Sequence, residues 1–208
     1  MTLNSREVVQ KVDSQLTSHP NAALKIIAER LGIAAQIIEE SLHEVEGLSF
    51  HEFRANKRLA QAFDQLGENS PALIGPYETP RGRRRVIIPK TTVRYQPHSP
   101  LHWMRKSSYS TQCPLVDLSR DGLAFLTDHA PMPEKQVSML LKFPGGEEVP
   151  RLKGRVVYAV ATGIAGYRYR VGVQFLPFVD RRGCNAIKVL DLLVNLEQTY
   201  TPFASDKA

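Results

Sequence analysis

The first third of the chain has its apolar residues at helical spacing. Val8 and Val12 fall on one face of a first helix, because residues four apart lie on the same side of a helix. A second apolar stripe begins after Asn21 and ends at Gly32, which are a typical helix cap and helix stop. Two further helices follow. The pattern therefore predicts an all-α domain of four helices over residues 1–67.

The third and fourth helices are predicted from their ends as well as from their stripes. The third runs over residues 34–46 and stops at Gly47. The fourth begins at Ser49, which forms a capping box with Glu52: each side chain bonds the backbone N–H of the other residue. The residues of the third helix that we expect to point inward are Ile37, Ile38, Leu42 and Val45.

After the fourth helix the pattern changes to short runs typical of β-strands. Residues 68–80 contain three prolines and a glycine and are predicted to be a linker. Six strand-like runs follow, separated by turn signals such as Asp121-Gly122, and a last helix is predicted over residues 182–200. We therefore expect residues 81–200 to form a six-stranded antiparallel β-barrel with a terminal helix, and 201–208 to be a tail. The six runs are RVIIPKTTVRY, CPLVDLS, GLAFLT, QVSMLLKF, RLKGRVVYAV and YRYRVGVQF.

The charge of the chain is divided unevenly between these two parts. The whole chain carries 27 Lys and Arg against 21 Asp and Glu, a net charge of +6. Residues 1–70 hold 7 basic and 10 acidic residues, a net charge of −3, whereas residues 71–208 hold 20 and 11, a net charge of +9. An anionic partner is therefore expected to bind in the second part.

Composition and motifs exclude several classes of protein. With 42% hydrophobic and 23% charged residues the chain is expected to be globular, and no apolar run approaches the ~18 residues of a membrane helix. The first residues lack the pattern of a signal peptide, and Cys113 and Cys184 have no metal-ligand spacing. No Gly-rich phosphate loop, GxSxG or HExxH motif occurs. We therefore expect a cytoplasmic protein that is not an enzyme and that holds no metal and no cofactor.

Two short stretches of the second part carry candidate binding chemistry. Arg81 and Arg85 are four residues apart in RGRRR, a spacing that puts both side chains on one face of an extended segment. About thirty residues later, the stretch from Asp117 to Gly122, DLSRDG, lies at the end of one predicted strand and the turn into the next. Taken alone, the arginines fit a polynucleotide, a small phosphate ligand or a solvated linker, and DLSRDG fits an ordinary hairpin turn.

Taken together, the two motifs RxxxR and DxSxxG resemble the PilZ domain, the bacterial receptor module for the second messenger cyclic di-GMP. The resemblance covers roughly residues 79–200 and includes the terminal helix. Its further carriers are VRY at 93–95, GRVVYAV at 154–160 and YRVGVQFL at 169–176. The resemblance implies a PilZ-type barrel that binds a cyclic dinucleotide and moves without catalysing a reaction.

The resemblance also assigns roles to the arginines. It implies that Arg81 and Arg85 grip the ligand from a mobile segment, and Arg84 is a candidate for a further phosphate contact. Arginine suits this ligand, because its planar fork binds phosphate or the O6/N7 edge of guanine with two hydrogen bonds, and its flat face stacks on a base. Lysine would lose both geometries.

The second motif is expected to supply the barrel side of the same site. The carboxylate of Asp117 can accept hydrogen bonds from guanine N–H groups, and the Ser119 hydroxyl can bond a base edge or a phosphate. Gly122 is expected to adopt a positive φ in the turn and to leave room for the ligand.

A third group of residues, in which arginine and tyrosine alternate, has two possible interpretations. Arg168 and Arg170 alternate with Tyr167 and Tyr169, which is a pattern that could stack the bases of a nucleic acid. We favour the simpler interpretation, in which the arginines form the polar face of one strand and the tyrosines its packed face.

The helical part has a resemblance of its own. Residues 24–66 resemble the first helix-turn-helix of AraC-type transcription regulators, through IAERLGI at 27–33 and LSFHEFRANKRLAQA at 48–62. The second helix-turn-helix of that family has no counterpart here, because the chain continues into the linker and the barrel.

The charge of the third helix opposes DNA binding. Residues 34–46 would be the recognition helix, yet they contain four glutamates and no Lys or Arg, and Glu40 stands where the family usually has a basic residue. Binding to DNA depends on neutralising phosphates, which these carboxylates oppose. Two roles stay open: a cyclic di-GMP-responsive transcription regulator, and a module for contact with a protein partner or for self-association. We favour the second.

Overall fold

The protein is described by a computed structural model that covers residues 4–68, 85–97 and 110–200. The chain divides into two compact units, Met1–Asp64 and Gln65–Ala208. The linker predicted over 68–80 and the predicted tail over 201–208 lie almost wholly outside the described residues.

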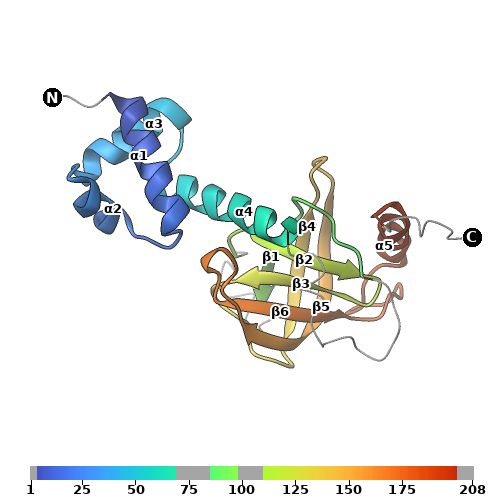
Figure 1. Cartoon of the computed structure of the whole chain (residues 1–208). Coiled ribbons are helices and arrows are strands. Elements are labelled where there is room, and N and C mark those ends of the chain that lie inside the picture. Colours follow the sequence, from blue (N-terminus) through green and yellow to red (C-terminus); the bar gives the residue numbers. More distant parts are fainter. Residues whose placement is uncertain (1–3, 69–84, 98–109, 201–208) are drawn as a thin grey trace, which may run out of the picture. The chain divides into compact units, whose positions relative to one another are not determined.

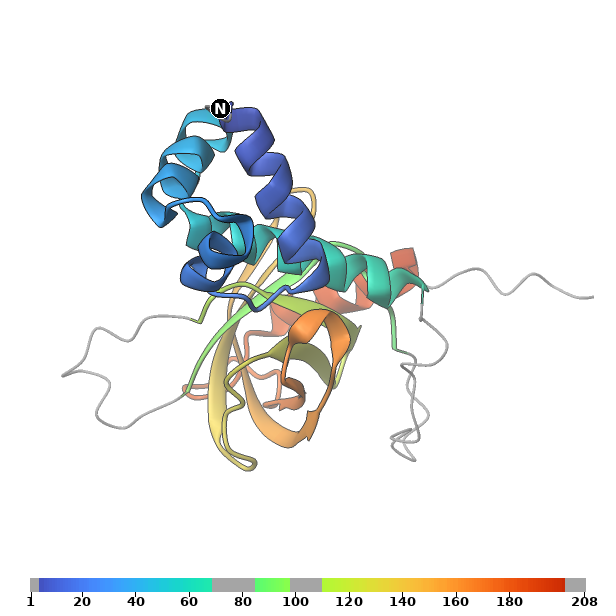
Figure 2. The same cartoon turned by 60° about the vertical axis from the view of Figure 1, so that its left-hand side comes forward.

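The first unit consists of helices around a small apolar core, as the sequence predicts (Figures 1 and 2). Its core is built from residues that recur every three or four positions, so that each helix buries one stripe. The helices are α1 (Ser5–Ser18), α2 (Leu24–Leu31), α3 (Ala35–Glu46) and α4 (Phe50–Glu68), of which the residues from Gln65 on belong to the second unit. The side chains at their centre, all without exposed surface, are Val8, Val12, Leu16, Ile27, Ile38 and Leu42.

Three of the predicted helix ends are confirmed, those at Gly32, Gly47 and Ser49. Gly32 and Gly47 end α2 and α3 with φ of 64° and 68°, the left-handed conformation that a side chain would disfavour. The capping box before α4 is complete: the Ser49 N–H donates to Glu52 Oε2 at 3.0 Å, and the Glu52 N–H donates to Ser49 Oγ at 3.3 Å. The hydrogen bond from the Ser49 backbone, and then that from its hydroxyl, lowers the pKa of Glu52.

Two details of the helical prediction are wrong. Helix α2 begins at Leu24 after Ala23, which makes no side-chain cap bond, so Asn21 is not its cap. Ile37 and Val45 do not point inward, since 47% and 38% of their surfaces are exposed. The inward stripe of α3 is narrower than the apolar pattern suggests, and it contains a polar residue: its buried residues are Ile38, Ser41 and Leu42.

The second unit contains a closed β-barrel of six antiparallel strands, which confirms the predicted fold (Figure 1). Around the barrel the strands follow the order β1-β2-β3-β6-β5-β4. Strand β3 therefore lies between β2 and β6, although β6 is the last strand along the chain. The strands are β1 (Thr92–Pro97), β2 (Cys113–Ser119), β3 (Gly122–Thr127), β4 (Gln136–Lys142), β5 (Glu148–Ala161) and β6 (Tyr169–Phe175).

The barrel core is filled by alternate residues of each strand, and the terminal helix packs against it. On β6, for example, Val171, Val173 and Phe175 belong to the core. Helix α5 (Ile187–Tyr200) lies beside the barrel in Figure 1 and inserts Leu193, which is 2% exposed, into the same core. Among the described helices, α5 included, none is both long and apolar enough to cross a membrane.

Tyr95 on β1 is a buried polar group whose hydroxyl has two partners. It donates to the carbonyl of His129 and lies 3.1 Å from the Thr127 hydroxyl, while its ring packs against Phe125 at 5.0 Å. Burial raises the pKa of Tyr95 above its ordinary value of 10.0. The folded state therefore favours the neutral phenol, and this contribution to stability is complete below pH 10 and is lost as the pH rises through the raised pKa.

We predict that Tyr95→Phe lowers the free energy of unfolding at neutral pH by about 1–2 kcal/mol, because the partly buried carbonyl of His129 loses its donor. The variant should also lose less stability than the wild type above pH 10, because it has no phenol to ionise. Urea denaturation at pH 7 and at about pH 10.5 measures both effects. Equal alkaline losses in the two proteins would contradict this account.

Candidate functional site

A β-bulge in β2 aims Asp117 at the outside of the barrel. Leu115 and Leu118 both belong to the barrel core although they are three residues apart, a spacing that a regular strand would place on opposite faces. The pairing with β3 shifts between Leu115 and Asp117, so the strand holds one extra residue there. Without the bulge, Asp117 would share the inward face of Leu115. With it, the carboxylate lies on the outer surface, 10% exposed.

A short bridge brings Arg85 to this carboxylate. Val86 and Leu118 exchange both backbone hydrogen bonds, Val86 N–H to Leu118 O at 2.8 Å and Leu118 N–H to Val86 O at 2.9 Å. Val86 is 4% exposed and packs into the barrel core, and this burial anchors the segment. Arg85 stands one residue before the bridge and Asp117 one residue before Leu118. The end of the RxxxR motif therefore meets the start of DxSxxG.

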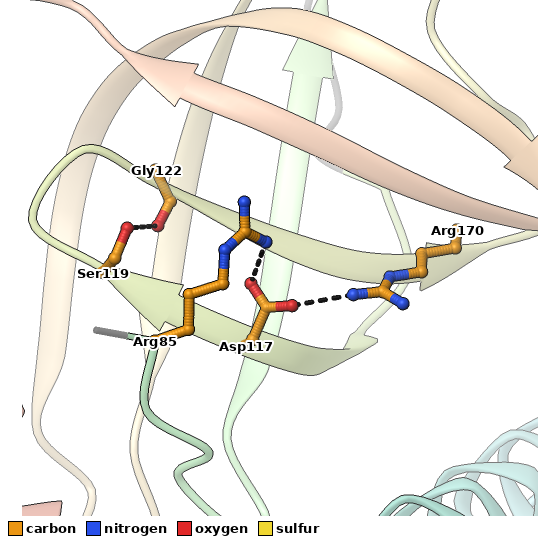
Figure 3. Close-up of polar contacts among 5 residues, drawn as sticks. All are labelled: Arg85, Asp117, Ser119, Gly122 and Arg170. Atoms are coloured by element: carbon orange, nitrogen blue, oxygen red, sulfur yellow. Dashed lines mark hydrogen bonds and ion pairs between the residues drawn. The ribbon is translucent and has the colours of Figure 1, made fainter. Parts of the chain in front are cut away.

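The two oxygens of the Asp117 carboxylate each pair with a different arginine (Figure 3). Arg85 Nη1 donates to Oδ1 at 2.9 Å, and Arg170 Nη2 donates to Oδ2 at 2.8 Å. The side chain of Arg85 is 33% exposed and that of Arg170 is 15% exposed. The site thus presents two guanidinium groups around one carboxylate, a local excess of positive charge that favours an anion.

Ser119 and Gly122 close the hairpin beside this cluster, as Figure 3 shows. The two residues pair with each other, and the Ser119 hydroxyl donates to the Gly122 carbonyl at 3.2 Å. The expected positive φ at Gly122 is wrong, because its backbone is not in that region. Glycine is needed for another reason: a Cβ there would lie 2.2 Å from the Val173 carbonyl oxygen on β6. Close approach of two strands, and not turn geometry, requires this residue.

The turn between β2 and β3 is also tied to the terminal helix. Arg120 Nε donates to Glu197 Oε2 on α5 at 2.6 Å, and the Glu197 side chain is only 8% exposed. On the other side of the turn, the Asp121 carbonyl accepts from the Phe175 N–H at the end of β6 at 2.7 Å. The DxSxxG hairpin is therefore held from α5 and from β6, which fixes the positions of Asp117 and Ser119.

The structure brings together four of the six residues expected at the site. Arg85, Asp117, Ser119 and Gly122 lie in one cluster on the outer face of β2 and its turn. Arg81 and Arg84 lie outside the described residues.

Arg170 is the residue that the sequence analysis missed. The alternation of Arg168 and Arg170 with tyrosines does put arginine on the outer, polar face of β6, in agreement with the interpretation that we favoured. The contact with Asp117 cannot be derived from spacing, since the two residues are 53 positions apart. It depends on the strand order, in which only β3 separates β6 from β2.

Comparison with known protein families agrees with this fold. A family model described as the PilZ domain matches residues 85–190, which contain Arg85, the DxSxxG motif and Arg170. This chain therefore belongs to the PilZ domain family. No curated protein matches the chain.

The solved structures to which the chain is similar are distant in sequence. The chain is similar to YcgR from Escherichia coli in complex with c-di-GMP, with 12% identity and a TM-score of 0.43 over 58% of this chain and 46% of that one. It is also similar to the PilZ domain of YcgR with c-di-GMP, with 13% identity and a TM-score of 0.41 over 59% and 92% of the two chains. For MrkH of K. pneumonia, in a c-di-GMP complex, the values are 12% and 0.41 over 58% and 53%. The similar region thus spans about half of the YcgR and MrkH chains in these two complexes.

Proposed function

We propose that this chain is a receptor for cyclic di-GMP. The observation that carries the proposal is the ion pair of 2.9 Å between Arg85 and Asp117, which joins the two motifs of the nucleotide site on the surface of a PilZ barrel. The proposed ligand contacts are Arg81, Arg84, Arg85, Asp117, Ser119 and Gly122.

The chemistry of the cluster suits a cyclic dinucleotide. Arg85 is the more exposed of the two arginines, and its fork can bind a phosphate with two charge-assisted hydrogen bonds. Asp117 and Ser119 stand at the same edge, where a carboxylate accepts from guanine N–H groups and a hydroxyl bonds a base or a phosphate. Because Gly122 has no side chain, the hairpin that carries Asp117 and Ser119 can lie close against β6.

The proposal includes a change of arrangement between the two parts of the chain. Arg81 and Arg85 stand where the linker after α4 meets the barrel. Binding of both arginines to one ligand would order this junction and so reorient the helical domain. The proposed output is control of a protein partner or of self-association.

A thermal-shift measurement tests the proposal. Cyclic di-GMP at about 100 times its dissociation constant should stabilise the native protein by about 2.7 kcal/mol, which is a clear rise of the melting temperature. GMP and cyclic di-AMP serve as controls, because one lacks the second phosphate and base and the other lacks the guanine edge. Equal shifts with all three nucleotides, or none with cyclic di-GMP, would contradict the proposal.

The helical domain is proposed to act through protein contact and not through DNA. Two basic residues of α4 that could approach DNA phosphates already serve the fold: Arg54 Nη1 donates to the Ala22 carbonyl at 3.2 Å, and Lys57 Nζ lies 2.6 Å from Asp13 Oδ1. Glu40 on α3 is exposed and would face the phosphates.

A gel shift with fragmented genomic DNA at low salt separates the two roles. We expect no retention of DNA, with or without cyclic di-GMP. Salt-sensitive retention that requires the nucleotide would support a transcription regulator instead.

A further inference from the structure

Arg170 belongs to neither of the two sequence motifs, yet it makes the more buried contact with Asp117. Its side chain is 15% exposed, against 33% for Arg85, and its 2.8 Å contact with Oδ2 comes from a paired strand in the barrel wall. Arg85 instead precedes the single bridge at Val86. One partner of the carboxylate is therefore fixed in the barrel wall, and the other stands one residue before an isolated bridge.

The sequence of the barrel makes room for this contact. Arg170 must reach from β6 across β3 to β2, over two strand spacings of about 4.8 Å each. The residue of β3 that pairs with Asp117 is Ala124. A large side chain there would stand in the way, whereas alanine leaves a path along which a long side chain can lie. Gly172 of β6, which pairs with Ala124, does not add to this path, because an added Cβ there would lie 2.1 Å from the ring of Tyr158.

The proposed ligand creates an electrostatic problem that Arg170 is placed to solve. When Arg85 moves to a phosphate, Asp117 loses one of its two cations while an anion approaches the site. A carboxylate that is 10% exposed and left without compensation is costly, and like charges close together repel. Because Arg170 bonds the other oxygen, it can stay with Asp117 throughout.

We propose that Arg170 is a positioning residue of the nucleotide site, which holds the Asp117 carboxylate in place and balances its charge when Arg85 turns from Asp117 to the ligand. This inference rests on the proposed function as a cyclic di-GMP receptor. Asp117 accepts a hydrogen bond from one nitrogen of the Arg85 guanidinium, where a phosphate oxygen could bind instead. Arg85 thus changes its partner when the ligand binds, whereas Arg170 stays bonded to Asp117.

Titration calorimetry with cyclic di-GMP tests this assignment on the full chain. Arg170→Gln should weaken binding about 10- to 100-fold, because Asp117 keeps no cation in the bound state. Arg170→Lys should bind cyclic di-GMP at least about tenfold more tightly than Arg170→Gln, because lysine keeps the positive charge although it lacks the planar fork of arginine. The matched control is Arg168→Gln, which removes an exposed arginine two residues before Arg170 and should bind within about threefold of the wild type.

The outcomes separate this inference from the proposed function. Wild-type protein that does not bind cyclic di-GMP overturns both. Wild-type binding together with unchanged binding by Arg170→Gln overturns the role of Arg170 alone. Melting temperatures show whether each variant folds. If Arg170→Gln does not fold, Arg170→Lys decides: a folded lysine variant must bind within about tenfold of the wild type, and binding as weak as that of Arg85→Ala would refute the assignment.

Discussion

Arg85→Ala is expected to lower the affinity for cyclic di-GMP by at least about 100-fold, because it would remove the two charge-assisted hydrogen bonds that we propose between Arg85 and a phosphate of the ligand. The fold should survive, since Arg85 is 33% exposed and Asp117 keeps its second partner, Arg170. The anchor of the segment, the bridge between Val86 and Leu118, uses backbone atoms only. Calorimetry measures the affinity, and a melting curve confirms the fold.

The same variant tests whether the ligand changes the arrangement of the two domains. Small-angle X-ray scattering should show a change of overall dimensions when the wild type binds cyclic di-GMP, and no change for Arg85→Ala. Arg155→Ala is the control, because it also removes an arginine of the barrel. Arg155 forms an exposed ion pair with Glu134 at a distance of 3.5 Å, and its loss should leave the scattering change of the wild type intact. A ligand-dependent change that persists in Arg85→Ala would refute the coupling through this residue.

Gly122→Ala is expected to destabilise the barrel by about 3 kcal/mol, which lowers the melting temperature by roughly 10 °C. The added Cβ would lie 2.2 Å from the Val173 carbonyl oxygen, and real Cβ contacts are never so short. The obstacle is backbone, so β3 and β6 must separate where Gly122 pairs with Gln174. Ligand binding should weaken as well, because the DxSxxG hairpin moves away from β6.

Gly145→Ala is the matched control for this effect. Gly145 lies in the turn between β4 and β5, has no atom within 4 Å of an added Cβ, and does not have a positive φ. Its substitution should leave the melting temperature nearly unchanged. If Gly122→Ala melts like Gly145→Ala, then close approach of β3 and β6 is not the reason for glycine at this position.

The fold could be predicted largely because each element is encoded locally. Left-handed glycines at 32 and 47 and the Ser49–Glu52 box define helix ends through interactions within a few residues. The strands follow from alternation and turn signals in the same way. Ile37 and Val45 show the limit of such reasoning, because the apolar pattern does not tell which side of α3 its neighbours cover.

The site could be predicted only in so far as it lies in contiguous motifs. RxxxR and DxSxxG mark Arg85 and Asp117, and the bridge at Val86 joins them. Arg170 could not be found, because its contact requires the order β2-β3-β6 and a bulge that turns Asp117 outward. Gly122 was found for the wrong reason, since the clash with β6 that requires glycine is invisible until the strands are paired.

In the proposed function, the pair of Arg85 and Asp117 forms part of the cyclic di-GMP site. Titration calorimetry of the purified chain with cyclic di-GMP, beside Asp117→Ala, tests it most directly and gives the stoichiometry from the same curve. We predict saturable binding by the wild type and at least about tenfold weaker binding by a folded Asp117→Ala, which loses a hydrogen-bonding partner of guanine. Absence of binding by the wild type, or equal binding by both proteins, would contradict the account.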